Sequence, residues 1–268
     1  MIGVLDALTV DGPVGRLAGW AVGRPNERTP VLFLHPVNSA GRIWQRVAAG
    51  LDPDRYCLLP DLRGHGGSVR RGPFTVEGYM DDVLAVLDAT GVEQAHLVGG
   101  SLGGAVAVAL AATAPERVAS VAAVGSLLNL KVSGEELETI AQTVRSLGTQ
   151  GFFEDIAPGT LAPGADPALV EQVVNLATSG GRAPEMVTAV LLNALQSDVS
   201  HLAAGVQCPC LVATGEHDAW CTPDVGRAMA EALSTPHQLL PGLGHLPMLE
   251  APDVVASMLN EHLRSSDA

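Results

Sequence analysis

Short apolar runs alternate with longer amphipathic segments along most of this chain. The run VLFLH at 31–35 is continuously apolar, which is typical of a strand buried on both faces of a sheet. The segment at 42–51 then carries apolar residues at helical spacing. This order predicts an α/β fold with a mainly parallel central sheet and helices on both faces. The further strands are expected at 56–61, 95–100, 118–126, 208–216 and 237–245, and the further helices at 75–91, 102–115, 223–234 and 252–265.

The region 127–203 breaks this alternation, because it contains helical patterns and no strand pattern. Its amphipathic segments, such as GEELETIAQTVRSL and PALVEQVVNLAT, are separated by loops rich in glycine and proline. We therefore expect an α/β core made of residues 1–126 and 204–268. Residues 127–203 are expected to form a helical cap, or lid, inserted between two strands of that core.

Composition limits the partners of the chain. Its 268 residues include 15 Lys and Arg against 29 Asp and Glu, a net charge of −14. Because such a surface repels phosphate backbones and anionic lipids, we expect neither nucleic acid nor a membrane as a partner. The four cysteines suggest no disulfide framework, and the N-terminus has no basic segment followed by a long apolar one. These features predict a cytoplasmic protein with reduced cysteines, and they leave a homodimer open.

The stretch VGGSLGG at 98–104 places a serine between a predicted strand and a predicted helix. Gly99, Ser101 and Gly103 match the G-x-S-x-G pattern of a nucleophile elbow, in which small neighbours allow a strained turn that exposes the serine hydroxyl. The alternative is a glycine-rich phosphate loop. That interpretation is disfavoured because the lysine of a P-loop is absent.

A serine nucleophile needs a base, and the base needs a group that orients it. On this type of sheet the chain order is serine, acid, histidine. His245 follows the last predicted strand, and Asp218 follows the strand before it, so both are expected at the edge that carries Ser101. Two other carboxylates compete for the role of acid, namely Glu216 and Asp224. We expect Glu216 to lie too close to the strand end, and Asp224 to belong to the first turn of the next helix.

These motifs together resemble the α/β-hydrolases, in particular the assemblage of esterases, lactonases and C–C hydrolases. The resemblance covers nearly the whole chain and is strongest to the 3-oxoadipate enol-lactone hydrolase type. It implies the α/β-hydrolase fold, a Ser101–Asp218–His245 triad and no cofactor or metal, and it leaves the substrate undefined. The pieces that carry it are VLFLHPVNSAGRIW, LLPDLRGHGGS, VGGSLGG, LVATGEHD and GLGHLPMLEAP.

One segment departs from the family pattern, since Pro36 follows His35 where relatives usually have glycine. Proline has no N–H to donate. By the family's register the oxyanion hole is then formed by the backbone N–H groups of Val37 and Leu102. The side chain of Asn38 is an alternative donor, and ordinary turn chemistry is the other interpretation of that residue.

The resemblance implies a serine hydrolase that cleaves a carboxylic ester or lactone of a small to medium, largely apolar molecule through an acyl-enzyme. Alternatives on the same scaffold are C–C bond or thioester hydrolysis, cofactor-free oxygenase or perhydrolase chemistry, and a non-catalytic ligand receptor. No carboxylate clamp stands out, although Arg63, Arg145 and Arg182 are candidates. The residues expected to contact substrate are His35, Asn38, Leu128, Phe152, Phe153 and Leu246.

Overall fold

The computed structural model describes residues 5–129 and 132–267. The remaining positions of the predicted core and cap, 1–4, 130–131 and 268, lie outside the described residues. The described strands form one sheet in the order β1-β2-β4-β3-β5-β6-β7-β8. Pairing is parallel from β4 to β8 and antiparallel at β1–β2 and β2–β4, so the predicted α/β fold with a mainly parallel sheet is confirmed. The strands that the alternation predicted are β3 (Val31–Leu34), β4 (Cys57–Pro60), β5 (Ala95–Gly100), β6 (Val118–Val124), β7 (Cys210–Gly215) and β8 (His237–Leu240).

Alternate residues of the central strands pack into two separate apolar cores, one on each face of the sheet. In β3, Leu32 and Leu34 pack into one core, whereas Val31 and Phe33 pack into the other. All four side chains are completely buried. A strand covered on both faces therefore needs an unbroken apolar run, which is why these strands could be recognised in the sequence.

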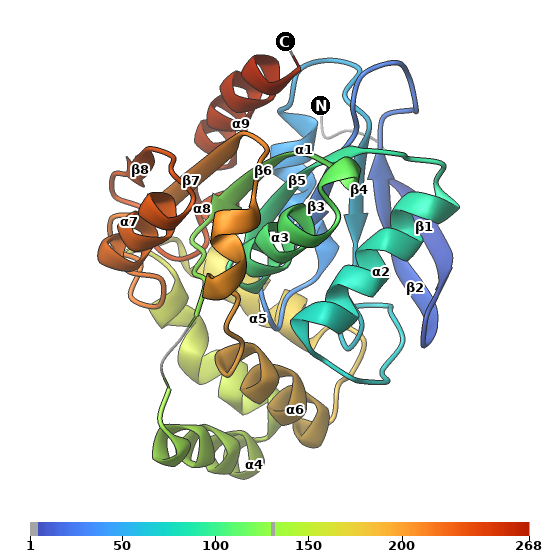
Figure 1. Ribbon diagram of the computed structural model, residues 1–268. Helices are drawn as coiled ribbons and strands as arrows, with labels where there is room; N and C mark the ends of the chain where they lie inside the picture. Colours follow the sequence, from blue (N-terminus) through green and yellow to red (C-terminus); the bar gives the residue numbers. More distant parts are fainter. Residues whose placement is uncertain (1–4, 130–131, 268) are drawn as a thin grey trace.

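Helices cover both faces of the sheet (Figure 1). One core contains side chains of α2, α3 and α7, and the other contains side chains of α1, α8 and α9. Helix α2 begins as predicted, with the Thr75 hydroxyl accepting a hydrogen bond from the Gly78 N–H at 3.3 Å. The bounds of these helices are α1 (Gln45–Ala49), α2 (Val76–Ala89), α3 (Leu102–Thr113), α7 (Pro223–Ala232), α8 (Pro247–Glu250) and α9 (Pro252–Ser266).

The N-terminal hairpin was not predicted from the sequence. Strands β1 (Leu5–Gly12) and β2 (Gly15–Val22) pair with each other, and β2 continues antiparallel onto β4. Most residues of β1 are exposed or half-buried, with Val10 the one fully buried position. An edge strand of this kind carries only a weak apolar pattern, and that pattern escaped the sequence analysis.

Three α-helices lie in the described part of the chain between β6 and β7, where the helical patterns predicted helices. They are α4 (Gly134–Ile156), α5 (Pro167–Thr178) and α6 (Pro184–Leu195). Helix α4 is kinked at Gly148, whose φ of +68° interrupts the helical backbone. The three share an apolar cluster of their own, and Figure 1 shows α4 and α6 beyond one end of the sheet. The division into a core and a cap at residues 127 and 203 stays a prediction.

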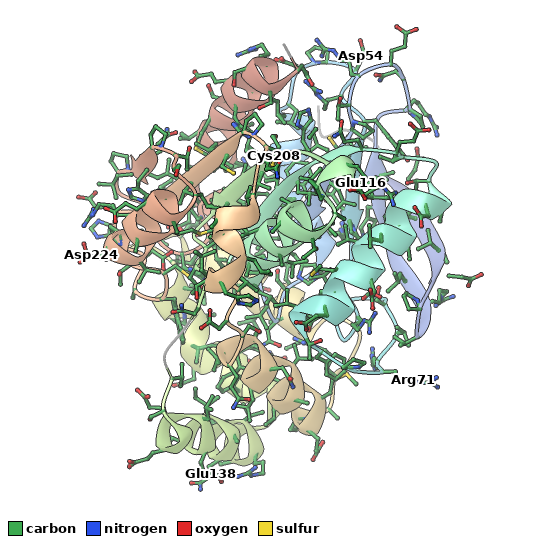
Figure 2. All side chains as sticks on the ribbon, viewed as in Figure 1. Asp54, Arg71, Glu116, Glu138, Cys208 and Asp224 are labelled. Carbon is green, nitrogen blue, oxygen red and sulfur yellow. The ribbon has the colours of Figure 1, made fainter. Side chains whose placement is uncertain are left out.

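Several charged side chains are labelled on the ribbon in Figure 2. Figure 2 shows Asp54, Arg71, Glu138 and Asp224 at the margin of the molecule, and these four residues and Glu116 are exposed. None of the helices within residues 5–129 and 132–267 has both the length and the apolar character needed to span a bilayer.

Candidate active site

Ser101 occupies a sharp turn between β5, which ends at Gly100, and α3, which begins at Leu102. Its backbone has φ +50° and ψ −119°, a conformation that residues other than glycine rarely adopt. The turn is held by the Ser101 N–H, which donates to the Val124 carbonyl at 3.2 Å. The buried Ser126 hydroxyl, which the sequence did not point to, donates to the Ser101 carbonyl at 2.6 Å. The serine therefore has the backbone expected of a nucleophile elbow.

The two glycines of the motif are required by close backbone contacts. A Cβ atom on Gly99 would lie 2.3 Å from the carbonyl carbon of Gly103, and one on Gly103 would lie 2.3 Å from the carbonyl oxygen of Leu34. Strand β5, the turn and helix α3 can thus pack this closely only without side chains at positions 99 and 103. The sequence pattern is explained by the packing.

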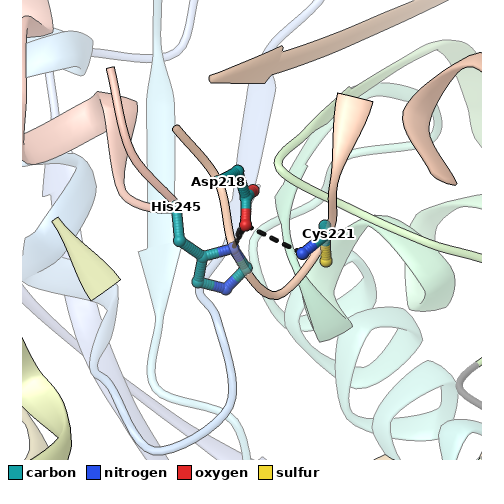
Figure 3. A group of neighbouring side chains, drawn as sticks. All are labelled: Asp218, Cys221 and His245. Atoms are coloured by element: carbon teal, nitrogen blue, oxygen red, sulfur yellow. Dashed lines mark hydrogen bonds and ion pairs between the residues drawn. The ribbon is translucent and has the colours of Figure 1, made fainter. Parts of the chain in front are cut away.

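His245 and Asp218 meet at the end of the sheet (Figure 3). The His245 Nδ1–H donates to both carboxylate oxygens of Asp218, at 3.0 and 2.9 Å. Asp218 is 3% exposed, and its Oδ1 also accepts the backbone N–H groups of Trp220 at 2.9 Å and Cys221 at 2.8 Å. Because a carboxylate accepts and does not donate, this arrangement assigns the proton to Nδ1 and leaves Nε2 with its lone pair.

The competing carboxylates lie elsewhere. The Glu216 Oε2 accepts the Gly242 N–H at 2.8 Å on the exposed side of its loop. Asp224 is exposed in the first turn of α7 and pairs with Arg227. Of these three candidate acids, Asp218 alone contacts His245.

Ser101 and His245 line one cavity of about 130 Å³. Helices α4, α5 and α6 and the loops at the end of the sheet both contribute to it, and its walls are mostly apolar. Among the lining residues the only ionisable side chains are His245 and Cys221. An engineered cavity of roughly 150 Å³ holds a benzene molecule, so the space suits a small uncharged group. Of the predicted substrate contacts, the cavity is lined by Asn38, Leu128, Phe153 and Leu246.

Residues 36–39, which we call the oxyanion loop, form another part of the wall together with Leu102. Among the described residues, neither the Val37 N–H nor the Leu102 N–H has a hydrogen-bond partner. Two donors without partners beside a serine hydroxyl are what an oxyanion hole requires. The next residue, Asn38, has φ +56°, and its N–H donates to His65 Nε2 at 3.0 Å.

Two buried histidines support the oxyanion loop. His35 Nε2 accepts the Leu62 N–H at 3.0 Å, as His65 Nε2 accepts the Asn38 N–H. Both rings must be neutral to accept these bonds, and burial lowers the pKa of each. His35 is fully buried and absent from the cavity wall. This corrects the expectation that His35 contacts substrate, because both of its ring nitrogens are engaged by backbone groups.

The candidate arginines do not form a carboxylate clamp. Arg63 is buried against Asp82 at 2.7 Å, and Arg145 pairs with Glu138 at the surface. Arg182 is 4% exposed, and its Nη1 donates to the Asn38 Oδ1 at 2.8 Å. No carboxylate of the described chain pairs with Arg182, and burial lowers its pKa to about 10. This residue, between α5 and α6, therefore holds the oxyanion loop from behind the cavity wall.

Phe152 also differs from expectation. It lies inside the cap, edge-on to Phe153 with 5.2 Å between ring centroids, and does not reach the cavity. Trp220 and Cys221 do line the cavity, and sequence reasoning missed them. Their position immediately after Asp218 was the one local indication, since residues beside a catalytic loop often reach the site.

A family model described as the alpha/beta hydrolase fold matches residues 29–252. This chain belongs to that family. It is 30% identical to a pimeloyl-[acyl-carrier protein] methyl ester esterase of Chromobacterium violaceum, over 88% of this chain and 94% of that protein. It is 22% identical to 3-oxoadipate enol-lactonase 1 of Acinetobacter baylyi, over 97% and 98% of the two chains.

A solved structure of a thermophilic esterase from Thermogutta terrifontis superposes with a TM-score of 0.86 at 27% identity, covering 98% of this chain and all of that one. The resemblance read from the motifs is thereby confirmed at the level of the family. The relatives include esterases and a lactonase, so the family of this chain is one of hydrolases.

Proposed function

We propose that this chain is a serine hydrolase that cleaves carboxylic esters or lactones of small, largely apolar molecules through an acyl-enzyme. The observation that carries the proposal is one cavity lined by both Ser101 and His245, with Asp218 bonded to the far side of the imidazole. In acyl transfer by such a group of three, the histidine transfers the proton and the aspartate orients the imidazole and stabilises its charged form.

The reaction follows from the proton positions. His245 Nε2 takes the proton of the Ser101 hydroxyl as Oγ forms a bond to the substrate carbonyl carbon. The imidazolium is stabilised by Asp218, which is held in turn by the Trp220 and Cys221 N–H groups. His245 then returns the proton to the leaving alkoxide, and a water molecule repeats the sequence to release the acid.

Charge that develops on the carbonyl oxygen would be received by the Val37 and Leu102 N–H groups. They are backbone donors without partners among the described residues, and they need not reorganise when the charge appears. Each such donor contributes about 3 kcal/mol to transition-state stabilisation. Pro36, which stands where relatives usually have glycine, removes neither donor, since the two N–H groups belong to Val37 and Leu102.

The cavity wall favours a neutral acyl group. A carboxylate on the substrate would be buried against apolar side chains, and none of the lining residues that the structure describes offers it a cationic partner. Burying an unpaired carboxylate is strongly unfavourable. We therefore propose esters and lactones without a free carboxylate, in contrast to an enol-lactone whose acyl part is an adipate.

The test compares Ser101→Ala with Ser257→Ala, an exposed serine on α9. We expect a fluorophosphonate probe to label the wild type and Ser257→Ala at Ser101, and kcat to fall by about 10³ or more in Ser101→Ala. Among neutral esters, acetyl to butyryl groups should react best. Dimethyl glutarate should react faster than its half-ester, monomethyl glutarate.

Other results identify the alternatives. Undiminished turnover by Ser101→Ala would refute the acyl-enzyme and favour cofactor-free chemistry by His245. Preferential cleavage of thioesters or of C–C bonds would keep the triad and refute the proposed substrate class. Binding without turnover of any activated ester would favour a receptor.

A further inference from the structure

A thiol lies beside the histidine and the aspartate of the site, and the mechanism above does not use it. The ligand atoms offered by Asp218, Cys221 and His245 all lie within 4.8 Å of one another, and all three residues are buried (Figure 3). Carboxylate, thiolate and imidazole are the ligand types that zinc prefers in proteins.

The backbone holds this cluster in place. Cys221 follows Asp218 by three residues in a turn, and its own N–H donates to Asp218 Oδ1 at 2.8 Å. Asp218 is in turn fixed to His245 Nδ1 at 2.9 Å. Cys221 is 1% exposed, yet it lines the same cavity as Ser101, so a small ion can reach it by the route that substrate uses.

The thiol is not a second nucleophile. Burial, and then the charge of Asp218, raise the pKa of Cys221 well above its ordinary value. At neutral pH the group is a thiol, and it becomes a thiolate only when something replaces its proton. Metal coordination does this, because a bound cation deprotonates a coordinating thiol outright.

We propose that a thiophilic divalent cation, with zinc as the type, binds Asp218, Cys221 and His245 and thereby switches off the hydrolase. The inhibitory effect rests on the proposed function, whereas the binding itself does not. In the binding step the Cys221 S–H bond breaks, an S–metal bond forms and that proton passes to solvent. The metal also replaces the proton on His245 Nδ1, and that proton moves to Nε2. The imidazole engaged by the metal can then no longer take the proton of Ser101.

The geometry requires only a small adjustment. Zinc bonds of about 2.0–2.3 Å place neighbouring ligands of a tetrahedral ion roughly 3.3–3.8 Å apart. Separations of at most 4.8 Å thus close with side-chain movements of about 1 Å or a little more. Three protein ligands suffice, since zinc sites with three ligands keep one position open. Magnesium and calcium prefer oxygen ligands and should not compete.

Cobalt(II) is the probe for binding, because a thiolate ligand gives it an absorption band of charge-transfer type. The titration uses Ser101→Ala as the background, so that it does not depend on turnover. We expect one cobalt ion per chain with that band, displaced by zinc and not by magnesium. Cys221→Ser in this background should lose the band and weaken zinc binding by about 100-fold.

Cys208→Ser is the matched control. Cys208 and Cys210 lie before and at the start of β7, whereas Asp218 and Cys221 follow the end of that strand. The two thiols form a second place where a soft ion could bind. The control should keep the band. Loss of the band in Cys208→Ser, or an unchanged spectrum in Cys221→Ser, would overturn the assignment.

A second pair of variants covers the case in which Cys221→Ser does not fold. Asp218→Asn and His245→Gln should retain the thiolate band but bind zinc at least tenfold more weakly. Unaltered zinc affinity in both would overturn the site. Inhibition of the wild type by zinc should follow the same dissociation constant. A cobalt band in a chain without hydrolase activity would refute the proposed function alone, and an active chain without the band would refute the metal site alone.

Discussion

Replacing Gly103 by alanine tests whether the serine turn depends on the close approach of three backbone segments. The added Cβ would lie 2.3 Å from the carbonyl oxygen of Leu34 and 2.7 Å from its carbonyl carbon. Leu34 ends β3, which is paired on both sides in the middle of the sheet, so it cannot move away without breaking those ladders. Overpacking costs 1–3 kcal/mol when side chains can yield, and here the opposing atoms are backbone. We expect a loss of about 3 kcal/mol or more in the free energy of unfolding.

The measurement is urea denaturation, with Gly134→Ala as the control. Gly134 starts α4, its Cβ would meet nothing within 4 Å, and alanine is the better helix former by up to about 1 kcal/mol. The control should be unchanged or slightly stabilised. In the Gly103→Ala protein that remains folded, the rate at which a fluorophosphonate labels Ser101 should fall at least tenfold. A Gly103→Ala midpoint equal to that of the control, with labelling at the wild-type rate, would refute this account of the elbow.

Three further predictions concern the acid, the pH dependence of stability and the cap. Asp218→Asn should lower kcat by about 10⁴ by permitting the wrong imidazole tautomer, while Glu216→Gln stays near wild type; the reverse pattern would exclude the assigned acid. Burial holds the pKa of His262 at about 4. In the unfolded chain His262 has its ordinary pKa of about 6.5, so on acidification the unfolded state takes up this proton before the folded state does. The free energy of unfolding should therefore fall by about 3 kcal/mol as the pH drops from above 6.5 to 4. Urea midpoints across this range measure the slope, which His262→Gln should reduce. Arg182→Met should lower kcat at least tenfold with little change in KM for a short ester, because the oxyanion loop loses its hydrogen bond from the cap; Arg145→Met, at the surface, should change neither value.

The central strands were predictable because burial on both faces demands an unbroken apolar run. Val31–Leu34 meets that demand with four apolar residues, all completely buried. Strand β1 does not, since most of its side chains are half-buried or exposed, and it was missed. Periodicity thus identifies an element to the extent that the element is covered by others.

The site was predictable where its residues sit at ends of predicted strands. Ser101, Asp218 and His245 follow β5, β7 and β8, and parallel strands bring such ends to one edge. The role of Arg182 and the positions of His35 and Phe152 depend instead on how cap helices pack and how loops bond. No local pattern encodes those contacts, so the sequence placed two of these residues wrongly and offered Arg182 only as a clamp.

The hydrogen bond from Arg182 to Asn38 joins positions 144 residues apart in the chain. It joins the segment between α5 and α6 to the loop that carries Asn38 in the cavity wall. Helices α4–α6 with a residue other than arginine at position 182 would leave Asn38 Oδ1 without this donor, and Arg182 above a core without Asn38 would lose that acceptor while keeping the Ala177 carbonyl. An exchange of the chain between β6 and β7 with another member of the family therefore keeps this hydrogen bond when residues 38 and 182 are transferred together.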